Sequence, residues 1–138
     1  MTSNNRIVDT RHIDFGSQIP SEGYCDQPYV VQTDDGAWLC IMTTGSGHEG
    51  ATGQHVVSTR SFDRGKSWSA LVDVEPANGP EASYAVALKV ATGRIYTFYN
   101  HNSDNIRKVQ AANPPYVSGY CNRVDSLGHF VFKYSDDG

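Results

Sequence analysis

The stretch from Ser61 to Trp68 reads Ser-Phe-Asp-Arg-Gly-Lys-Ser-Trp and constrains the fold of this chain more than any other. Ser61 and Asp63 are two residues apart, so their side-chain oxygens can fold back onto nearby backbone N–H groups. Gly65 can adopt a positive φ, and Trp68 offers the returning strand a large apolar anchor. The stretch therefore predicts a turn between two antiparallel strands that satisfies its own hydrogen bonds.

A shorter version of the same pattern stands near residue 138. Ser135 and Asp137 occupy its first and third positions, directly after an aromatic run. Runs rich in β-branched and aromatic residues precede both versions, and Asp-Asp-Gly at 34–36 and Thr-Gly at 92–93 mark tight turns. These signals predict strands at residues 29–33, 37–43, 56–61, 68–74, 84–90, 94–99 and 129–134.

The pattern at Ser61, Asp63, Gly65 and Trp68 resembles the Asp box, Ser/Thr-x-Asp-x-Gly-x-x-Trp, of sialidase-like β-propellers. In that family the box joins the third and fourth strands of a blade, and blades repeat every 40 to 50 residues or so. The resemblance implies an all-β fold of four-stranded antiparallel blades, one at about residues 24–75 and an incomplete one at about 80–138. A closed propeller needs about four blades or more. Residues 1–138 are therefore expected to be the N-terminal part of one propeller domain whose remaining blades are missing from this chain.

Composition excludes several classes of function. A net charge of −4 gives no basic footprint, so a nucleic-acid partner is not expected. The 3 cysteines leave an odd thiol and show no Cys-x-x-Cys spacing, so we expect buried thiols and neither a disulfide framework nor a metal or other cofactor. No apolar segment follows the polar start of the chain, so no signal peptide or membrane span is expected, and the default location is cytoplasmic.

The expected topology sorts the loops onto two faces, because neighbouring strands of a blade run in opposite directions. The short turns and the Ser61–Trp68 stretch belong on one face. The starts of the inner strands and the loops between second and third strands belong on the other, at the axial mouth, which is a natural pocket. We predict a site on this second face. Its catalytic candidates are Asp26, His48, Glu49 and Glu81, and its substrate-binding candidates are Gln27, His55, Tyr84, Asn100 and His101.

The sialidase resemblance implies an exo-glycosidase that removes the terminal sugar of a glycan. In that family the first inner strand starts with Arg-Ile-Pro, and its arginine begins a clamp on the substrate carboxylate. Here the residues are Asp26-Gln27-Pro28, and an aspartate would repel that carboxylate. Glu49, assisted by His48, would take the acid/base role that an aspartate has in the family.

Two alternatives stay open. The first is a glycan-binding propeller without catalysis, for which the missing arginine is the best argument. The second is a polysaccharide lyase, in which the base would be one of His48, His55, His101 and Tyr84. Cationic side chains between residues 100 and 126 can contact an acidic sugar or can simply be solvated: Arg107, Lys108 and Arg123.

Overall fold

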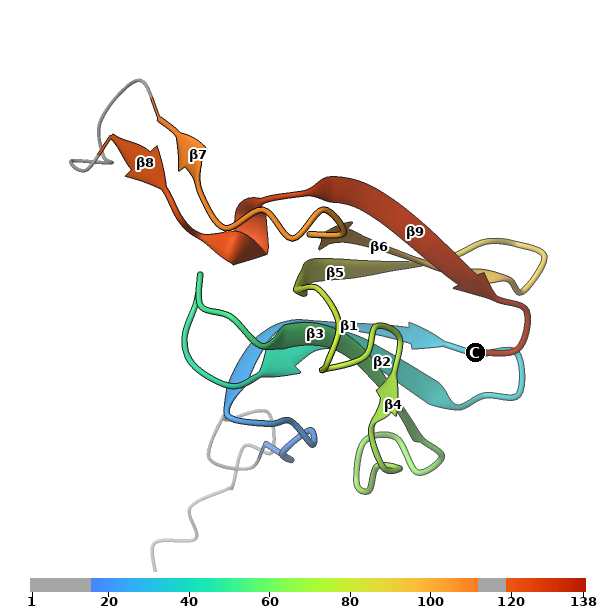
Figure 1. The fold of residues 1–138 in the computed structure, drawn as a ribbon. Helices are drawn as coiled ribbons and strands as arrows, with labels where there is room; N and C mark the ends of the chain where they lie inside the picture. Colours follow the sequence, from blue (N-terminus) through green and yellow to red (C-terminus); the bar gives the residue numbers. More distant parts are fainter. Residues whose placement is uncertain (1–15, 112–118) are drawn as a thin grey trace, which may run out of the picture.

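The computed structural model describes residues 16–111 and 119–138, which form two antiparallel sheets and a short ribbon (Figure 1). The first sheet has the order β1 (Tyr24–Gln32), β2 (Trp38–Gly45), β3 (Gln54–Ser61) and β4 (Val72–Asp73). The second has the order β5 (Ala82–Lys89), β6 (Ile95–His101) and β9 (His129–Ser135). The predicted all-β class is confirmed, since the part of the chain that the structure describes holds no α-helix.

The last predicted strand of the first half is shorter than expected. We expected residues 68–74, whereas β4 holds only Val72 and Asp73. The Ser69 hydroxyl accepts the Arg60 N–H at 3.0 Å, and the Thr59 hydroxyl donates to the Ser69 carbonyl at 2.8 Å. These side-chain hydrogen bonds compete with the regular backbone ladder, so β4 pairs with β3 only at Val72 and Asp73.

The connection between β6 and β9 has structure of its own. Its described residues include the two-stranded ribbon of β7 (Val109–Gln110) and β8 (Tyr120–Cys121) and the 3₁₀ turn η2 (Val124–Ser126). In Figure 1 the ribbon projects from the end of the second sheet at which the β2–β3 loop leaves the first. The two long loops therefore share one end of the molecule, which we call the rim.

The two sheets repeat each other residue by residue over their first two strands. Asp26 pairs with Thr43 and Tyr29 with Ile41, and the residues 57 positions later pair in the same way, Ser83 with Asn100 and Val86 with Phe98. Each first strand is irregular at the same place, between Asp26 and Tyr29 in β1 and between Ser83 and Val86 in β5. The β1–β2 and β5–β6 pairs are thus two copies of one unit.

The sheets pack face to face through an apolar core. Leu39, Ile41 and Val56 from the first sheet meet residues of the second, Ala82, Ala85, Ile95 and Tyr99. The small alanines of β5 let its backbone approach the first sheet closely. A second buried cluster, Cys40, Met42 and Val57, lies on the other face of the first sheet under Ile19, Trp68 and Leu71.

The three cysteines are free thiols, as expected. Cys40 and Cys121 are buried, and burial raises the pKa of Cys40 to about 11. The expectation of burial is wrong for Cys25, which is exposed because it lies at the start of the edge strand β1.

The Ser61–Trp68 stretch forms the predicted turn. The Ser61 hydroxyl accepts the Gly65 N–H at 2.7 Å, and Asp63 accepts the Ser67 N–H at 2.8 Å and the Ser67 hydroxyl at 2.6 Å. Gly65 has φ of 84°, and a Cβ there would lie 3.1 Å from the Trp38 ring. These carboxylate hydrogen bonds favour the charged form and lower the pKa of Asp63 to about 2.

The second version of the pattern has the same hydrogen bond from its serine to its aspartate, but its serine accepts the N–H of the third residue on, where Ser61 accepts that of the fourth. The Ser135 hydroxyl donates to Asp137 at 2.8 Å and accepts the Gly138 N–H at 2.9 Å. Gly138 in turn accepts a hydrogen bond from Arg60 of β3 at 2.9 Å. Both turns lie at the end of the molecule opposite the rim, as Figure 1 shows for the C-terminus.

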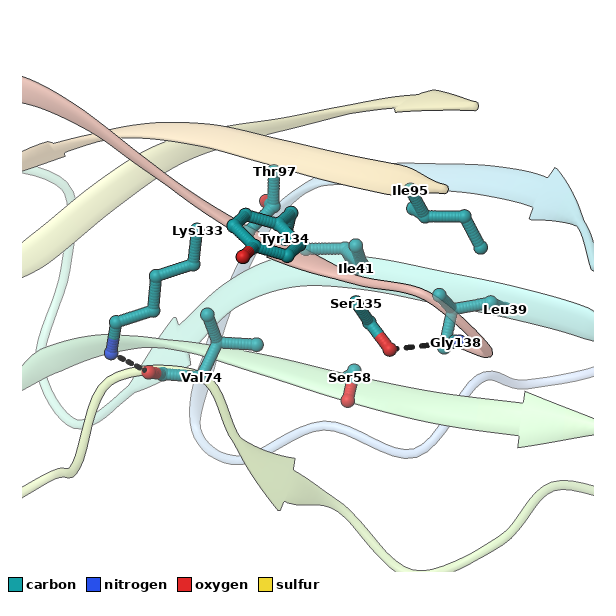
Figure 2. Close-up of a pocket in the computed structure, with 10 residues that line it drawn as sticks. All are labelled: Leu39, Ile41, Ser58, Val74, Ile95, Thr97, Lys133, Tyr134, Ser135 and Gly138. Carbon is teal, nitrogen blue, oxygen red and sulfur yellow. Dashed lines mark hydrogen bonds between the residues drawn. The ribbon is translucent and has the colours of Figure 1, made fainter. Parts of the chain in front are cut away.

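A hollow opens between the sheets at this turn end (Figure 2). Its lining is largely aliphatic, with Leu39, Ile41, Val74 and Ile95, and the Lys133 ammonium donates to the Val74 carbonyl across it at 2.6 Å. Of the Asp and Glu side chains within residues 16–111 and 119–138, none lines it, whereas Asp26, Glu49 and Asp125 gather around Tyr24 at the rim.

Candidate functional site

Arg123 is the centre of the rim. Its Nη2 donates to Glu49 Oε1 at 2.6 Å, to the Tyr84 hydroxyl at 2.7 Å and to Asp125 Oδ2 at 2.9 Å. The Tyr84 hydroxyl donates to the same Asp125 oxygen at 2.7 Å. One guanidinium thus ties together the β2–β3 loop, strand β5 and the turn η2.

The backbone positions these groups through two residues with positive φ. Tyr84 lies at the irregularity of β5 with φ of 57°, which turns its side chain out of the strand's alternation. Gly50 has φ of 85° and lies beneath Arg123, whose Cγ would be 3.0 Å from a Cβ at that position. A side chain at position 50 would push Arg123 away from its partners.

Buried hydrogen bonds fix the turn η2 against the second sheet. Asn100 donates to the carbonyls of Asp125 at 2.7 Å and Leu127 at 2.9 Å, and the Ser83 hydroxyl also donates to the Asp125 carbonyl. Asn100 is buried, so this predicted substrate-binding residue serves to hold the turn that carries Asp125.

The network favours a charged Asp125 and a protonated Tyr84. Burial opposes ionisation of Asp125, but the hydrogen bonds from Arg123 and Tyr84 outweigh it and lower the pKa of Asp125. Burial and the adjacent Asp125 carboxylate raise the pKa of Tyr84. A hydroxyl held protonated in this way is a poor general base, which disfavours the lyase role considered for Tyr84.

A second tyrosine lies among the carboxylates of the rim. Burial, followed by the negative charges of Asp26, Glu49 and Asp125, raises the pKa of Tyr24 to about 12. Asp26 is half-buried beside Tyr24, whereas Glu49 is exposed. Asp26 and Glu49 therefore contribute to one negative region around Tyr24 and Arg123.

Glu81 forms a separate ion pair. Its Oε1 accepts from Arg107 Nη1 at 2.8 Å, and its side chain is 7% exposed. Burial opposes ionisation of Glu81, yet the Arg107 hydrogen bond and charge prevail and lower its pKa. A proton donor for glycosyl transfer needs the opposite shift, so these surroundings disfavour Glu81 as the acid.

The predicted histidines have different environments. His55 is buried; its Nδ1 lies 3.1 Å from the Glu75 carbonyl and 3.3 Å from Asp73 Oδ1, and its Nε2 lies 3.2 Å from Glu22 Oε2. The His101 ring is tilted by 53° against that of Tyr99, with centroids 6.2 Å apart. His48 is exposed at the loop tip next to Glu49, so it is the histidine best placed to meet a ligand at the rim.

The structure thus brings together part of the predicted site. Glu49 and Tyr84 meet at Arg123, with Asp26 nearby, and Gln27 is exposed at the β1 irregularity. Asn100, His55 and Glu81 are engaged inside the protein. The sequence interpretation did not name Tyr24 or Asp125 among the site residues and left Arg123 undecided between ligand and solvent. The charge of Arg123 was the only sequence signal that it could bind a ligand, because no local sequence pattern places this residue at the rim.

Within residues 16–111 and 119–138, no three His, Cys, Asp or Glu side chains are grouped as metal ligands. Nor does a helix in these ranges have the length and apolar character needed to cross a bilayer.

Comparison with known proteins adds no family to this description. No protein-family model matches the chain, and no curated protein matches it either.

Proposed function

We propose that the two sheets are adjacent blades of a sialidase-like β-propeller and that the rim binds the terminal sugar of a glycan. The proposal is supported by the repeated β1–β2 and β5–β6 units and by the matching turns at Ser61 and Ser135. On this proposal further blades complete the ring, and the rim faces its axis.

The observation that carries the proposed function is the contact of Arg123 with Glu49, Tyr84 and Asp125. A guanidinium with hydroxyl and carboxylate neighbours offers the donors and acceptors that a sugar ring requires. Because Glu49 is exposed, a ligand can reach both it and Arg123 without unfolding the loop.

We propose exo-glycosidase activity with Glu49 as the proton donor to the leaving oxygen. Glu49 is paired with Arg123. The carboxylate of an acidic sugar can take Arg123 from Glu49, because it offers the guanidinium the same acceptors, and the Glu49 carboxyl group is then free to face the leaving oxygen. Sialidases use a tyrosine as the nucleophile in place of the second carboxylate. We expect this tyrosine and the remaining sugar contacts to come from other blades.

The test is turnover of a panel of aryl glycosides, sialosides included, by the protein at its full native length. We expect release of the aryl group from at least one acidic sugar and a loss of about 100-fold or more in kcat for Glu49→Gln. Asp136→Asn is the matched control, because Asp136 pairs with Arg94 at the turn end. Absence of turnover across the panel would exclude the glycosidase.

A second candidate is glycan binding without catalysis. It is favoured by the pairing of Glu49 and Asp125 with Arg123 and of Glu81 with Arg107, because these carboxylates are then engaged in ion pairs within the protein. Binding on a glycan array with no product formed would support this candidate over the glycosidase. Loss of that binding in Arg123→Met would assign it to the rim.

A further inference from the structure

The segment between β6 and β7 lies at the rim (Figure 1) and carries two neighbouring cations, Arg107 and Lys108. Both side chains are exposed. Arg107 donates through Nη1 to Glu81, and its guanidinium forms no other hydrogen bond within residues 16–111 and 119–138. Lys108 forms no ion pair with these residues, and its ammonium lies 4.9 Å from the centre of the Tyr120 ring. Both cations therefore keep N–H donors for a ligand.

Buried hydrogen bonds hold this segment in place. Asn102 is fully buried; it accepts the Ile106 N–H at 2.9 Å and donates to the Ile106 carbonyl at 2.8 Å. The Asn102 N–H donates to the Glu81 carbonyl at 2.9 Å. Asn102 thus fixes both the residue before Arg107 and the backbone of Glu81, which is the partner of Arg107. A ligand would therefore meet a guanidinium that is already oriented, which lowers the entropy cost of binding.

Arg107 and Arg123 have separate anchors on the second sheet. Arg107 pairs with Glu81 directly before β5, whereas Arg123 contacts Tyr84 within this strand. Three residues of strand span about 10 Å, whereas a charge-assisted hydrogen bond is about 3 Å long. A single carboxylate held by Arg123 therefore leaves the donors of Arg107 to a second group.

We propose that Arg107 and Lys108 form a second anion-binding subsite of the rim and that its ligand carries two anionic groups, one for Arg123 and one for this pair. The ligand class is a glycan whose terminal acidic sugar is joined to a second anionic sugar, which bears a carboxylate or a sulfate. This inference rests on the proposed glycan site, whose acidic sugar takes Arg123. Arg107 supplies planar donors and Lys108 a compact charge, a combination that suits either anion.

The test is calorimetric titration of the protein at its full native length with disaccharides of matched size. The terminal sugar is a uronate in one series and sialic acid in the other, and the second sugar is a neutral hexose, a uronate or a sulfated hexose. In dilute buffer we expect at least one dianion to bind about tenfold or more tightly than the disaccharide with the neutral hexose. This advantage should shrink at about 1 M salt, where the Debye length is about 3 Å. The dianion that binds more tightly identifies the second group as carboxylate or sulfate.

Variants separate this subsite from the contacts of Arg123. Lys108→Gln should reduce the advantage of the dianion by about threefold. Arg107→Met combined with Glu81→Gln, which leaves no unpaired charge, should remove most of it. Both proteins should bind the disaccharide with the neutral hexose like the parent. Lys66→Gln removes an exposed cation at the turn end and is the matched control, which should change neither affinity.

The outcomes distinguish this inference from the proposed function. Dianions that bind no more tightly than the disaccharide with the neutral hexose would overturn the second subsite and leave the proposed glycan site intact. An advantage that survives in the double variant would place the second anion elsewhere and would also overturn the inference. Absence of binding by every disaccharide would overturn both.

Discussion

Gln27 and Tyr84 occupy the same place in the repeated unit and share its unusual backbone, with φ of 49° and 57°. Each lies at the irregularity of the first strand of its sheet, where a non-glycine residue in the left-handed region costs about 1 kcal/mol or more. The cost is offset at Tyr84, whose hydroxyl contacts Arg123 and Asp125. Gln27 is exposed, and it has no phenol group of the kind on which the rim network depends at the equivalent Tyr84.

Glycine at these two positions should therefore have opposite effects. Gln27→Gly relieves the strained φ and should stabilise the protein by about 0.5 to 1 kcal/mol. Tyr84→Gly relieves the same strain but removes the hydroxyl between Arg123 and Asp125, and should destabilise by about 2 kcal/mol. Urea unfolding of both variants measures the difference, and equal shifts for the two would contradict the assignment.

The Asp63 turn should make stability depend on acid. Because the pKa of Asp63 falls from 3.8 to about 2 on folding, its stabilisation is present above pH 3.8 and is lost as the pH falls through about 2. Asp63→Ala should lower the melting temperature at neutral pH, and its deficit against the parent should shrink toward pH 2. Asp63→Asn keeps one acceptor oxygen, so its melting temperature at neutral pH should lie between those of the parent and Asp63→Ala. A deficit that does not change with pH would refute the role of the charge.

Removing Arg107 should leave the buried Glu81 carboxylate without its partner. We expect Arg107→Met to destabilise the protein by about 2 kcal/mol at neutral pH. The lowered pKa of Glu81 means that the parent gains from the pair above the unfolded-state pKa and loses that gain as the pH falls through the folded value. The variant should therefore approach the parent in acid. Adding Glu81→Gln should recover much of the loss at neutral pH, and a double variant as weak as the single one would argue against an unpaired charge.

Arg123→Met should loosen the rim. The buried Asp125 keeps its hydrogen bond from Tyr84 but loses the guanidinium, and we expect a destabilisation of about 2 kcal/mol, limited by the solvent around Arg123. Arg123→Lys keeps the charge but cannot reach three partners, so it should lose less stability than Arg123→Met but still be less stable than the parent. Arg94→Met removes an exposed pair at the turn end and should change stability little. Thermal unfolding of the three variants tests this order.

The sequence predicted what local chemistry determines and missed what distant residues determine. The Ser61–Trp68 turn and the strands beside it follow from side chains that satisfy nearby backbone groups, so a short window suffices. Arg123 reaches Glu49 across 74 positions of sequence, after a connection with no periodic pattern. The sequence also could not predict the left-handed backbone of Tyr84, because neither its residue type nor its neighbours favour a positive φ.

The interior roles of His55 and Asn100 have the same origin. We expected both in loops at the axial mouth, whereas His55 lies near the start of β3 and Asn100 near the end of β6, and the sequence could not tell that their side chains turn inward. His55 is enclosed by Glu22, Asp73 and Glu75, which come from both sides of β3 in the sequence. Asn100 donates hydrogen bonds to the carbonyls of a turn that begins more than twenty residues later in the sequence.

The most direct measurement is an NMR titration of the isotope-labelled protein with terminal sugars, comparing a sialoside, a uronide and a neutral hexoside. We expect an acidic sugar to shift the resonances of Glu49, Tyr84 and Arg123 and to leave those of the Asp63 turn unchanged. Arg123→Met should abolish the shifts. No response to any sugar, or shifts centred on the turn end, would contradict it.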